Sequence, residues 1–414
     1  MATELVCEIH PRLDAVSAEE WRRLFPDLPD SLEMIRLLQR CGIEGFVFHS
    51  IVVRWRDRPL LLLPLFETDY HLSGLVDVRA KRAVDLVMRG FPCLRSVRLL
   101  GVGFVESEWG QVGVDRQVSR PMLGMAWDLA LRALDALGHG LGADVTAFIN
   151  FTTQSGRMLP MAQLERFSQM AGLPFAQLSV RYTQPAQYIA SLSANMRSSL
   201  RRKLRKAQGV RVVRTREPGP WLDAIYEFYL ETFRRSDITF SQQPREFFQS
   251  VCQWLEDAVY ALYFVGDRLA GFRLQIVRPD CLLDKYFGMD RVLGREHNLY
   301  FVSWFKDVEY CIAQGIRFYH AGLTEEETKA RLGAQLIPSR ILFRHRQSVV
   351  HRILTMLARY FAYRPAMALP AVHLGSDWEQ PPVGFSASEA PVPVSAAIRM
   401  AEARPEPTMG VREN

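Results

Sequence analysis

The chain has 414 residues, of which 48% are hydrophobic and 23% are charged. This mixture is typical of folded globular proteins, and it excludes a fibrous or a wholly disordered chain. The length exceeds that of one ordinary domain, so we expect two hydrophobic cores. The formal net charge of +6 favours anionic partners, but it does not distinguish phosphate-bearing cofactors from acidic carrier proteins, RNA or anionic lipid surfaces.

Cell location is predicted from three features of the sequence. The six cysteines have no paired spacing, which indicates reduced thiols. The first residues carry no basic flank followed by an apolar stretch, so no secretory signal is expected. The most apolar run, residues 60–66, is far shorter than the ~20 residues that cross a bilayer. We expect a cytoplasmic protein and leave open a peripheral position on the inner membrane.

Two parts of the chain show the same order of elements. Residues 46–65 and residues 259–277 each contain an apolar strand, an Asp-Arg turn and a second strand, which is the pattern of a β-hairpin. A helix and a strand follow in residues 131–150, and residues 299–320 repeat them around a glycine. The period is much longer than the roughly 20 to 50 residues of solenoid repeats. We interpret this repeated order of elements as two similar domains, with chance similarity as the alternative.

Residues 188–206 are predicted to form a basic amphipathic helix. Its apolar residues recur on one face, and six arginine or lysine side chains lie elsewhere on it, between residues 197 and 206. The basic positions are either a plain solvated face or a contact surface for an acidic carrier protein, tRNA or anionic lipid. Residues 349–364 have an apolar face with basic flanks, which fits either a helix at a membrane interface or a helix that packs on its own domain.

The second half continues in an order that predicts a mixed sheet between helices. The predicted elements are a strand at 210–216, helices at 221–235 and 245–256, the hairpin, a strand at 282–287, a helix at 299–314 and a short strand that ends at His320. Proline, alanine, serine and glutamate dominate from residue 375 onward, which predicts a disordered tail.

The segment after the last of these strands is polar and has no core pattern. It contains Glu327, Lys329, Arg331 and Gly333 within a short distance of one another. We therefore predict a loop that serves a polar task rather than packing.

This order of elements resembles the fold of the GCN5-related N-acetyltransferases (GNAT). The sequence is similar in particular to predicted bacterial N-acyltransferases related to the Fem-type peptidoglycan-bridge transferases, through Glu327-x-Lys329 and Lys329-x-x-x-Gly333 followed by Pro338. The resemblance implies an α/β (α+β) fold with two tandem GNAT-like domains, each a mixed twisted sheet flanked by helices. The implied division is a degenerate N-terminal GNAT-like domain at 1–180, a basic connecting helix at 181–207, a C-terminal acyltransferase domain at 208–374 and the tail at 375–414.

The resemblance also implies where an acyl donor would bind. In GNAT proteins a basic, glycine-rich turn before the central helix holds the coenzyme A pyrophosphate. The corresponding residues here are Arg291, Gly294, Arg295 and Asn298. A plain turn with Asn298 as a helix cap is the alternative. The donor is acyl-coenzyme A or acyl-carrier protein as a co-substrate, or aminoacyl-tRNA; no permanently bound cofactor is expected, and no metal-ligand spacing is present.

Acyl transfer to an amine needs a group that accepts a proton and a group that stabilises the acyl oxygen. Asp284 and Tyr286 lie on an apolar strand, where a charge is costly without a task or a partner. His320 ends the following strand, and Glu327 and Lys329 lie in the polar segment. We predict these five residues as catalytic, with packing roles or solvated charges as the alternatives.

The resulting prediction is an N-acyltransferase. It would move an acyl group from a thioester to a primary amine of a lipid or cell-envelope precursor, and sphingolipid N-acylation is one specific form. An anionic membrane surface would contact the helix at 188–206, and no DNA partner is expected. The alternatives are a Fem-like aminoacyl-tRNA-dependent transferase, a polysaccharide acyltransferase and a catalytically inactive GNAT-derived binding protein; tRNA is a partner only under the first of these.

Overall fold

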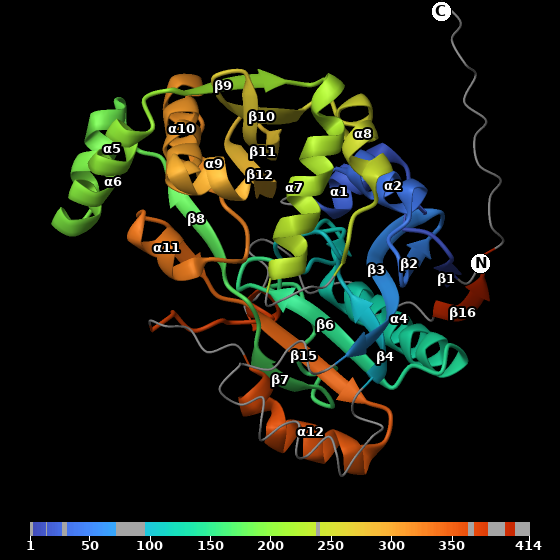
Figure 1. The fold of residues 1–414 in the computed structure, drawn as a ribbon. Helices are drawn as coiled ribbons and strands as arrows, with labels where there is room; N and C mark the ends of the chain where they lie inside the picture. The colour runs from blue at the N-terminus through green and yellow to red at the C-terminus, as the bar shows by residue number, and fades with distance from the viewer. Residues whose placement is uncertain are drawn as a thin grey trace, which may run out of the picture.

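A computed structural model of the protein describes residues 3–13, 15–26, 31–71, 96–236, 241–362, 368–379 and 394–401. Two mixed β-sheets, each flanked by helices, make up the described part of the chain (Figure 1). This architecture confirms the predicted α/β fold with two GNAT-like halves.

The first sheet has the strand order β16-β1-β2-β3-β4-β6-β15-β7, and β5 pairs with β3. Its strands are β1 (Thr3–His10), β2 (Phe46–Trp55), β3 (Arg58–His71), β4 (Ser96–Val102), β5 (Gly113–Val114), β6 (Val145–Phe151), β7 (Ser168–Ala171), β15 (Arg340–His345) and β16 (Val394–Met400). Helix α4 (Arg120–Gly140) fills the main core of this half with Trp127 and a row of leucines and alanines. Helix α1 (Ala18–Leu24) packs on β3 and β5, and α2 (Leu32–Cys41) lies at the border with the second half.

Both predicted hairpins are present. Strands β2 and β3 are joined by Arg56 and Asp57, which have φ values of 49° and 66°. Positive φ at both positions is what a two-residue turn between twisted strands requires. The turn therefore begins one residue earlier than the predicted Asp-Arg pair. In the second half, Gly266 and Asp267 occupy the equivalent place between β10 (Ala258–Val265) and β11 (Arg268–Val277).

The second sheet has the strand order β14-β8-β13-β12-β11-β10-β9. Its remaining strands are β8 (Phe175–Ser179), β9 (Val210–Thr215), β12 (Cys281–Met289), β13 (Phe318–His320) and β14 (Gln335–Ile337). Helices α7 (Leu222–Arg235) and α8 (Arg245–Trp254) cover one face, after the short 3₁₀ helix η3 (Gly219–Trp221). Helix α10 (Leu299–Gln314) covers the other face and ends at Gly315, whose φ of 68° closes the helix as predicted.

The two sheets exchange strands. Strand β8 lies within the predicted range 1–180 but pairs with β13 and β14 of the second sheet. Strand β15 lies within the predicted range 208–374 but inserts between β6 and β7 of the first sheet. Helix α2 packs on α8 in a shared core. The halves are therefore interlocked by the backbone as well as by side chains.

The polar segment after β13 is not a loop, as the sequence had suggested. Residues Glu326–Arg331 form helix α11, with acidic residues in its first turn and basic residues in its last. Those charges complement the helix dipole, and glutamate, lysine, alanine and arginine all favour helices. The helix was not evident because it is too short to carry an apolar stripe, and the side chain that it buries is Lys329.

The predicted helix at 188–206 is divided into α5 (Pro185–Ser191) and α6 (Ala194–Lys206). Ser193 separates them and caps α6 by accepting a hydrogen bond from the N–H of Met196. Helix α12 (Ser348–Phe361) packs Val350, Leu354 and Ala358 against the first sheet. This packing fits the interpretation of residues 349–364 as a helix that packs on the protein itself. None of the helices in the described part of the chain is long and apolar enough to cross a bilayer.

The range 375–414, predicted to be a disordered tail, contains two described elements. Helix α13 (Ser376–Glu379) follows Gly375, and β16 pairs in parallel with β1 along its whole length. The composition did not reveal β16, because its small residues gain their stability from backbone pairing at the edge of a sheet.

Candidate functional site

The strands β12 and β13 run side by side for only three residues and then diverge. The paired residues run from Cys281 opposite Phe318 to Leu283 opposite His320. Beyond that point β12 contains a bulge, because Asp284 and Tyr286 pair with consecutive residues of β11 and Lys285 is extra. A bulge re-aims the backbone and side chains around it. The opening between these strands is where the predicted residues meet groups from other elements.

A network of four charged side chains lies at the base of this opening, and Arg214, which is 19% exposed, is the most accessible of them. Arg273 of β11 is 3% exposed and forms ion pairs with Asp284 and with Asp307 of α10, the latter at 3.3 Å from Nε to Oδ2. Arg214 of β9 donates from Nη2 to the other oxygen of Asp307 over 2.8 Å. The Tyr319 hydroxyl accepts a hydrogen bond from Arg273 and lies 3.3 Å from Asp284 Oδ2. Two arginines thus balance two aspartates.

Asp284 keeps one free carboxylate oxygen. Its Oδ2 faces Arg273 and Tyr319, whereas Oδ1 is buried and has no hydrogen-bond partner among the described residues. An unsatisfied buried oxygen costs free energy, so such an atom points to a ligand or a reactant. Burial raises the pKa of Tyr319 well above its ordinary value, which keeps its hydroxyl proton available for donation.

A loop from the first half completes the opening. It follows β4 and carries Glu108, whose side chain is 7% exposed and whose Oε2 lies 3.3 Å from Nδ1 of His320. The two atoms are close enough for an ion pair but are not aligned as a hydrogen bond, and both remain unsatisfied among the described groups. Trp109 packs its ring on Phe175 and on His320, with ring centroids 4.7 and 5.6 Å apart. The first half therefore contributes directly to the site.

Lys329 of α11 is also buried, within electrostatic reach of Glu108. Its side chain is 6% exposed, and no hydrogen bond or ion pair of its Nζ atom is found within the described ranges. A Cβ atom built on Gly322 would lie 3.9 Å from this Nζ and 3.7 Å from the carbonyl oxygen of Asp284, so the amine lies near the middle of β12. Burial, and then the charge of Arg273, lower the pKa of Lys329 from 10.5 to about 7. An amine of this kind exchanges protons near neutral pH.

Tyr286, predicted as catalytic, holds the first-half loop instead. Its hydroxyl donates to the Glu106 carboxylate, which also accepts from Ser241, and Lys285 donates to the Glu106 carbonyl oxygen over 3.2 Å. These contacts join the loop to β12 two residues before Glu108. Tyr286, in the second half, thus helps to hold the first-half loop that carries Glu106 and Glu108.

Replacing Tyr286 with phenylalanine should lower stability more than it lowers activity. The ring keeps its packing on Phe248, but Glu106 loses a donor, and a hydrogen bond to a charged group is worth about 1.5–3 kcal/mol. We expect a loss of this size in the free energy of unfolding, measured with urea. Turnover should fall less than tenfold, because Ser241 and Lys285 still hold the loop. Tyr226→Phe is the matched control, and a Tyr286→Phe enzyme that is stable but inactive would contradict the anchoring role.

The remaining predicted residues do not join the site. Glu327 is 60% exposed and pairs with Arg331 one turn away. Arg291 pairs with Glu231 at 3.2 Å, and Arg295 is exposed on α9 (Arg291–Glu296). Gly294 is a packing residue, since a Cβ atom there would lie 2.7 Å from the sulfur of Met289.

The first turn of α9 is already capped by a carboxylate. Asp290 accepts hydrogen bonds from the N–H groups of Val292 and Leu293, both over 2.8 Å. These are the groups that would hold a pyrophosphate in a phosphate-binding turn. Asn298 precedes α10 in a left-handed conformation with φ of 50°, and its side chain makes no capping hydrogen bond. The segment is built as a capped helix followed by a turn.

Sequence reasoning missed Glu108, Arg273, Asp307 and Arg214. Arg273 and Asp307 had a detectable signal, since each is a charged residue inside an otherwise apolar strand or helix, as Asp284 is. Glu108 had no such signal. It lies on a loop of the half that carries little family likeness, and only the packing of the two halves brings it to His320.

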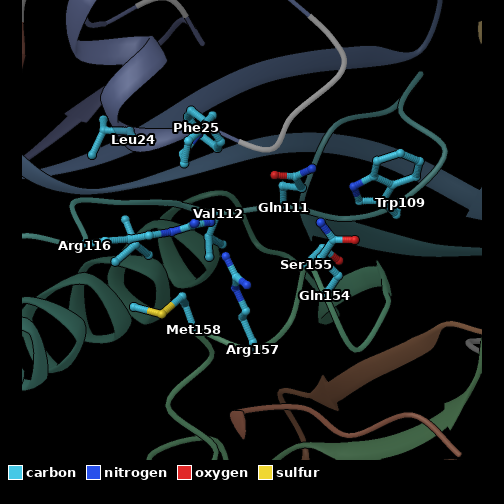
Figure 2. Close-up of a pocket in the computed structure, with 12 residues that line it drawn as sticks. Leu24, Phe25, Trp109, Gln111, Val112, Arg116, Gln154, Ser155, Arg157 and Met158 are labelled. Carbon is cyan, nitrogen blue, oxygen red and sulfur yellow. The ribbon is translucent and has the colours of Figure 1, made fainter. Parts of the chain in front are cut away.

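A small hollow lies on the first half's side of Trp109 (Figure 2). Its polar lining includes Gln111, Gln154 and Ser155, with Arg116 and Arg157 around them, and Phe25 is among its apolar residues. Trp109 thus lines the hollow and also packs on His320.

Comparisons with known proteins bear on the identity of this site. A sequence model of the FemAB-like family, described as peptidoglycan biosynthesis/recognition, matches residues 133–359, more than half of the chain. The chain belongs to the FemAB-like family. The match runs from α4 to α12 and includes Lys329, His320 and Asp284. The chain is accordingly a transferase of acyl or aminoacyl groups. No curated protein sequence matches it.

Solved structures agree with this fold. The crystal structure of FemX superposes with a TM-score of 0.50 at 10% identity, over 82% of this chain and 98% of that one. A tandem GNAT protein from the clavulanic acid biosynthesis pathway gives 0.48 at 14% identity, over 83% and 98%. L-PGS from Bacillus licheniformis gives 0.45 at 11% identity, over 81% and 98%. At these identities the FemX likeness establishes the fold of the FemAB-like chain and nothing about its substrates.

Proposed function

We propose that this FemAB-like protein transfers an acyl or aminoacyl group to a primary amine of a cell-envelope precursor. The observation that carries the proposal is a group of buried side chains where β12 and β13 diverge. Glu108, His320 and Oδ1 of Asp284 are unsatisfied among the described residues, and the buried amine of Lys329 lies with them. Side chains of this kind are costly in a folded protein unless a reaction uses them. The family description of peptidoglycan biosynthesis supports an envelope precursor as the acceptor.

The residues divide the chemistry between them. A primary amine reaches the site as an ammonium ion, and the carboxylates of Glu108 and Asp284 would attract it. The ammonium gives one proton to solvent, because only the neutral amine is a nucleophile. Lys329, whose pKa is about 7, would take a second proton as the nitrogen attacks the acyl carbonyl. The proton then goes to the oxygen or sulfur of the leaving group, so an amide forms and an ester or thioester bond breaks. No covalent enzyme intermediate is needed.

The N-termini of helices α9 and α10 bear on the identity of the acyl donor. Because Asp290 occupies the N–H groups at the start of α9, a pyrophosphate would meet a carboxylate there. The start of α10, the central helix, has no such cap, since the side chain of Asn298 makes no capping hydrogen bond. The donor is therefore acyl-coenzyme A, an acyl-carrier protein or an aminoacyl-tRNA. A sphingoid base remains a specific form of the acceptor to be tested beside peptidoglycan precursors.

The test is a transfer assay with the purified full chain. Three donors (aminoacyl-tRNA, acyl-carrier protein and acyl-coenzyme A) are each combined with peptidoglycan precursors and with a sphingoid base, and amide products are identified by mass spectrometry. We expect product with at least one combination and its loss, by about 10²-fold or more, in Glu108→Gln. Glu327→Gln is the matched control and should keep activity. If no combination gives an amide although a precursor or thioester binds, the alternative of an inactive binding protein is correct.

A further inference from the structure

Helix α12 has more apolar surface than it packs against the first sheet. The residues that contact the sheet form one row on the helix: Val350, Leu354 and Ala358. A second apolar row lies about 100° around the helix axis, the angle by which each residue turns an α-helix: Val349, Ile353 and Met356. Val349 is 68% exposed and Met356 is 66% exposed, and Ile353 between them is half-buried. This second row is the outer stripe of α12.

A row of exposed apolar side chains calls for an explanation that single ones do not. Val47 and Val292 are also exposed, but each is the single exposed large apolar residue of its strand or helix in the described part of the chain. Scattered side chains of this kind are ordinary on protein surfaces, whereas a contiguous apolar row marks a contact with a partner or a membrane. The outer stripe spans two helical turns, from Val349 to Met356, and is of the second kind.

The outer stripe is bordered by positive charge. Arg352 is exposed, lies one helical turn from each end of the stripe, and makes no side-chain ion pair or hydrogen bond within the ranges that the structure describes. Arg346 precedes the helix, is 56% exposed and pairs with Asp144 at 3.2 Å. From residue 328 to residue 376 the sequence contains eight arginines and lysines and not one aspartate or glutamate. A partner of this face is therefore expected to be anionic as well as apolar.

The other basic helix that the sequence suggested for a membrane contact has no such stripe. In α6, Leu200 is fully buried, and Met196 and Leu204 pack against the same core, so the apolar residues face inward. The strength with which a helix binds a bilayer surface depends on the apolar area that it inserts and on the attraction of its cations to anionic lipids. Helix α12 offers both components.

We infer that the outer face of α12 attaches the protein to the surface of an anionic phospholipid bilayer. The outer stripe would enter the boundary between headgroups and acyl chains, while Arg352 and Arg346 would extend to the phosphates. Figure 1 shows α12 on the outer side of β7 and β15, away from the second half. A second copy of this chain fits the face less well, because two such faces would bring arginines together without an acidic partner. The inference goes beyond the proposed function and does not depend on its chemistry.

Co-sedimentation of the full chain with lipid vesicles tests the inference. We expect the wild type to bind vesicles of phosphatidylcholine with phosphatidylglycerol, and to bind vesicles of phosphatidylcholine alone much more weakly. Val349→Gln combined with Met356→Gln keeps the helix propensity and should weaken binding at least about tenfold, because two apolar side chains no longer leave water. Arg352→Gln should weaken it about fivefold, the contribution of one basic residue at an anionic surface. Met356→Trp should bind at least as tightly as the wild type, since tryptophan favours the membrane interface.

The matched control makes the same change at exposed apolar residues elsewhere, as Val47→Gln combined with Val292→Gln, and should bind vesicles like the wild type. Urea unfolding checks that all variants are folded, which is expected because the replaced side chains are exposed. Absence of vesicle binding, equal binding to both kinds of vesicle, or equal losses in the control and the α12 variants would overturn the inference. A dimer that dissociates when the outer stripe is replaced, without any vesicle binding, would assign the face to a second copy instead. Vesicle binding needs neither donor nor acceptor, so this inference and the proposed function fail separately.

Discussion

Lys329→Met should produce an enzyme that is more stable than the wild type and almost inactive. The wild-type ammonium is buried with no partner for its Nζ in the described part of the structure, and methionine fills similar space without a charge. The lowering of its pKa from 10.5 to about 7 corresponds to a charging penalty on the order of several kcal/mol. We expect the free energy of unfolding at pH 7 to rise by ~2–4 kcal/mol. Loss of the proton acceptor should reduce transfer by about 10²–10⁴-fold.

The pH dependence of this effect has a definite sign. The unfolded chain binds a proton at Lys329 up to its ordinary pKa of 10.5, whereas the folded chain releases it near 7. Between these values the unfolded state holds more protons, so the wild type gains stability from Lys329 as pH rises. The advantage of Lys329→Met is therefore largest below pH 7 and fades toward pH 10.5. Wild-type transfer should rise with pH and level off above about 7, where the amine is neutral.

Urea unfolding at several pH values and transfer rates on the same samples measure both effects. Lys306→Met is the matched control, because Lys306 is partly exposed and pairs with Glu309 one turn away; it should change neither quantity appreciably. Lys329→Arg is the informative contrast, since arginine stays charged and should lose both activity and stability. An active Lys329→Met enzyme would rule out Lys329 as the proton acceptor and leave Glu108 or His320 for that role.

The sequence predicted the framework of the site better than its chemistry. The helix ending at Gly315 and the two hairpins follow from local periodicity and turn chemistry, which act within a few residues. Asp284 and His320 were predicted because a charged or titratable residue within or beside apolar strands is conspicuous. Lys329 was predicted through the family likeness, although the segment around it is a helix rather than a loop.

The rest of the site depends on contacts between distant parts of the chain. Glu108 reaches His320 only because the two halves share a core and exchange β8 and β15. Tyr286 is of a residue type that often takes part in catalysis, yet its hydroxyl donates a hydrogen bond to Glu106, which lies 180 positions away in the sequence. The phosphate-binding turn had been inferred from one glycine and two arginines. The glycine packs on Met289, and the capping carboxylate of Asp290 had not entered that inference.

Asp307→Leu is expected to cause the largest loss of stability among the variants considered. Asp307 is completely buried and receives both Arg214 and Arg273, so its removal leaves two arginines facing a single aspartate, Asp284. Breaking a buried ion pair from one side costs about 3–5 kcal/mol. Transfer should also fall at temperatures where the variant is folded, because Arg273 would no longer be held in place beneath Asp284.

A double-mutant cycle separates this network from ordinary loss of packing. Arg214→Met combined with Asp307→Leu removes one positive and one negative charge, so Arg273 and Asp284 remain as a balanced pair. We expect the double variant to regain ~1–3 kcal/mol relative to the sum of the single variants, measured by urea unfolding.

Asp115→Leu provides the comparison: that buried aspartate pairs with Arg23 and Arg58, whose side chains are 31% and 39% exposed. Solvent can rehydrate those two arginines, so the loss of Asp115 should cost less stability and leave transfer unchanged. If the single effects at Asp307 and Arg214 are additive, the four charges are not coupled.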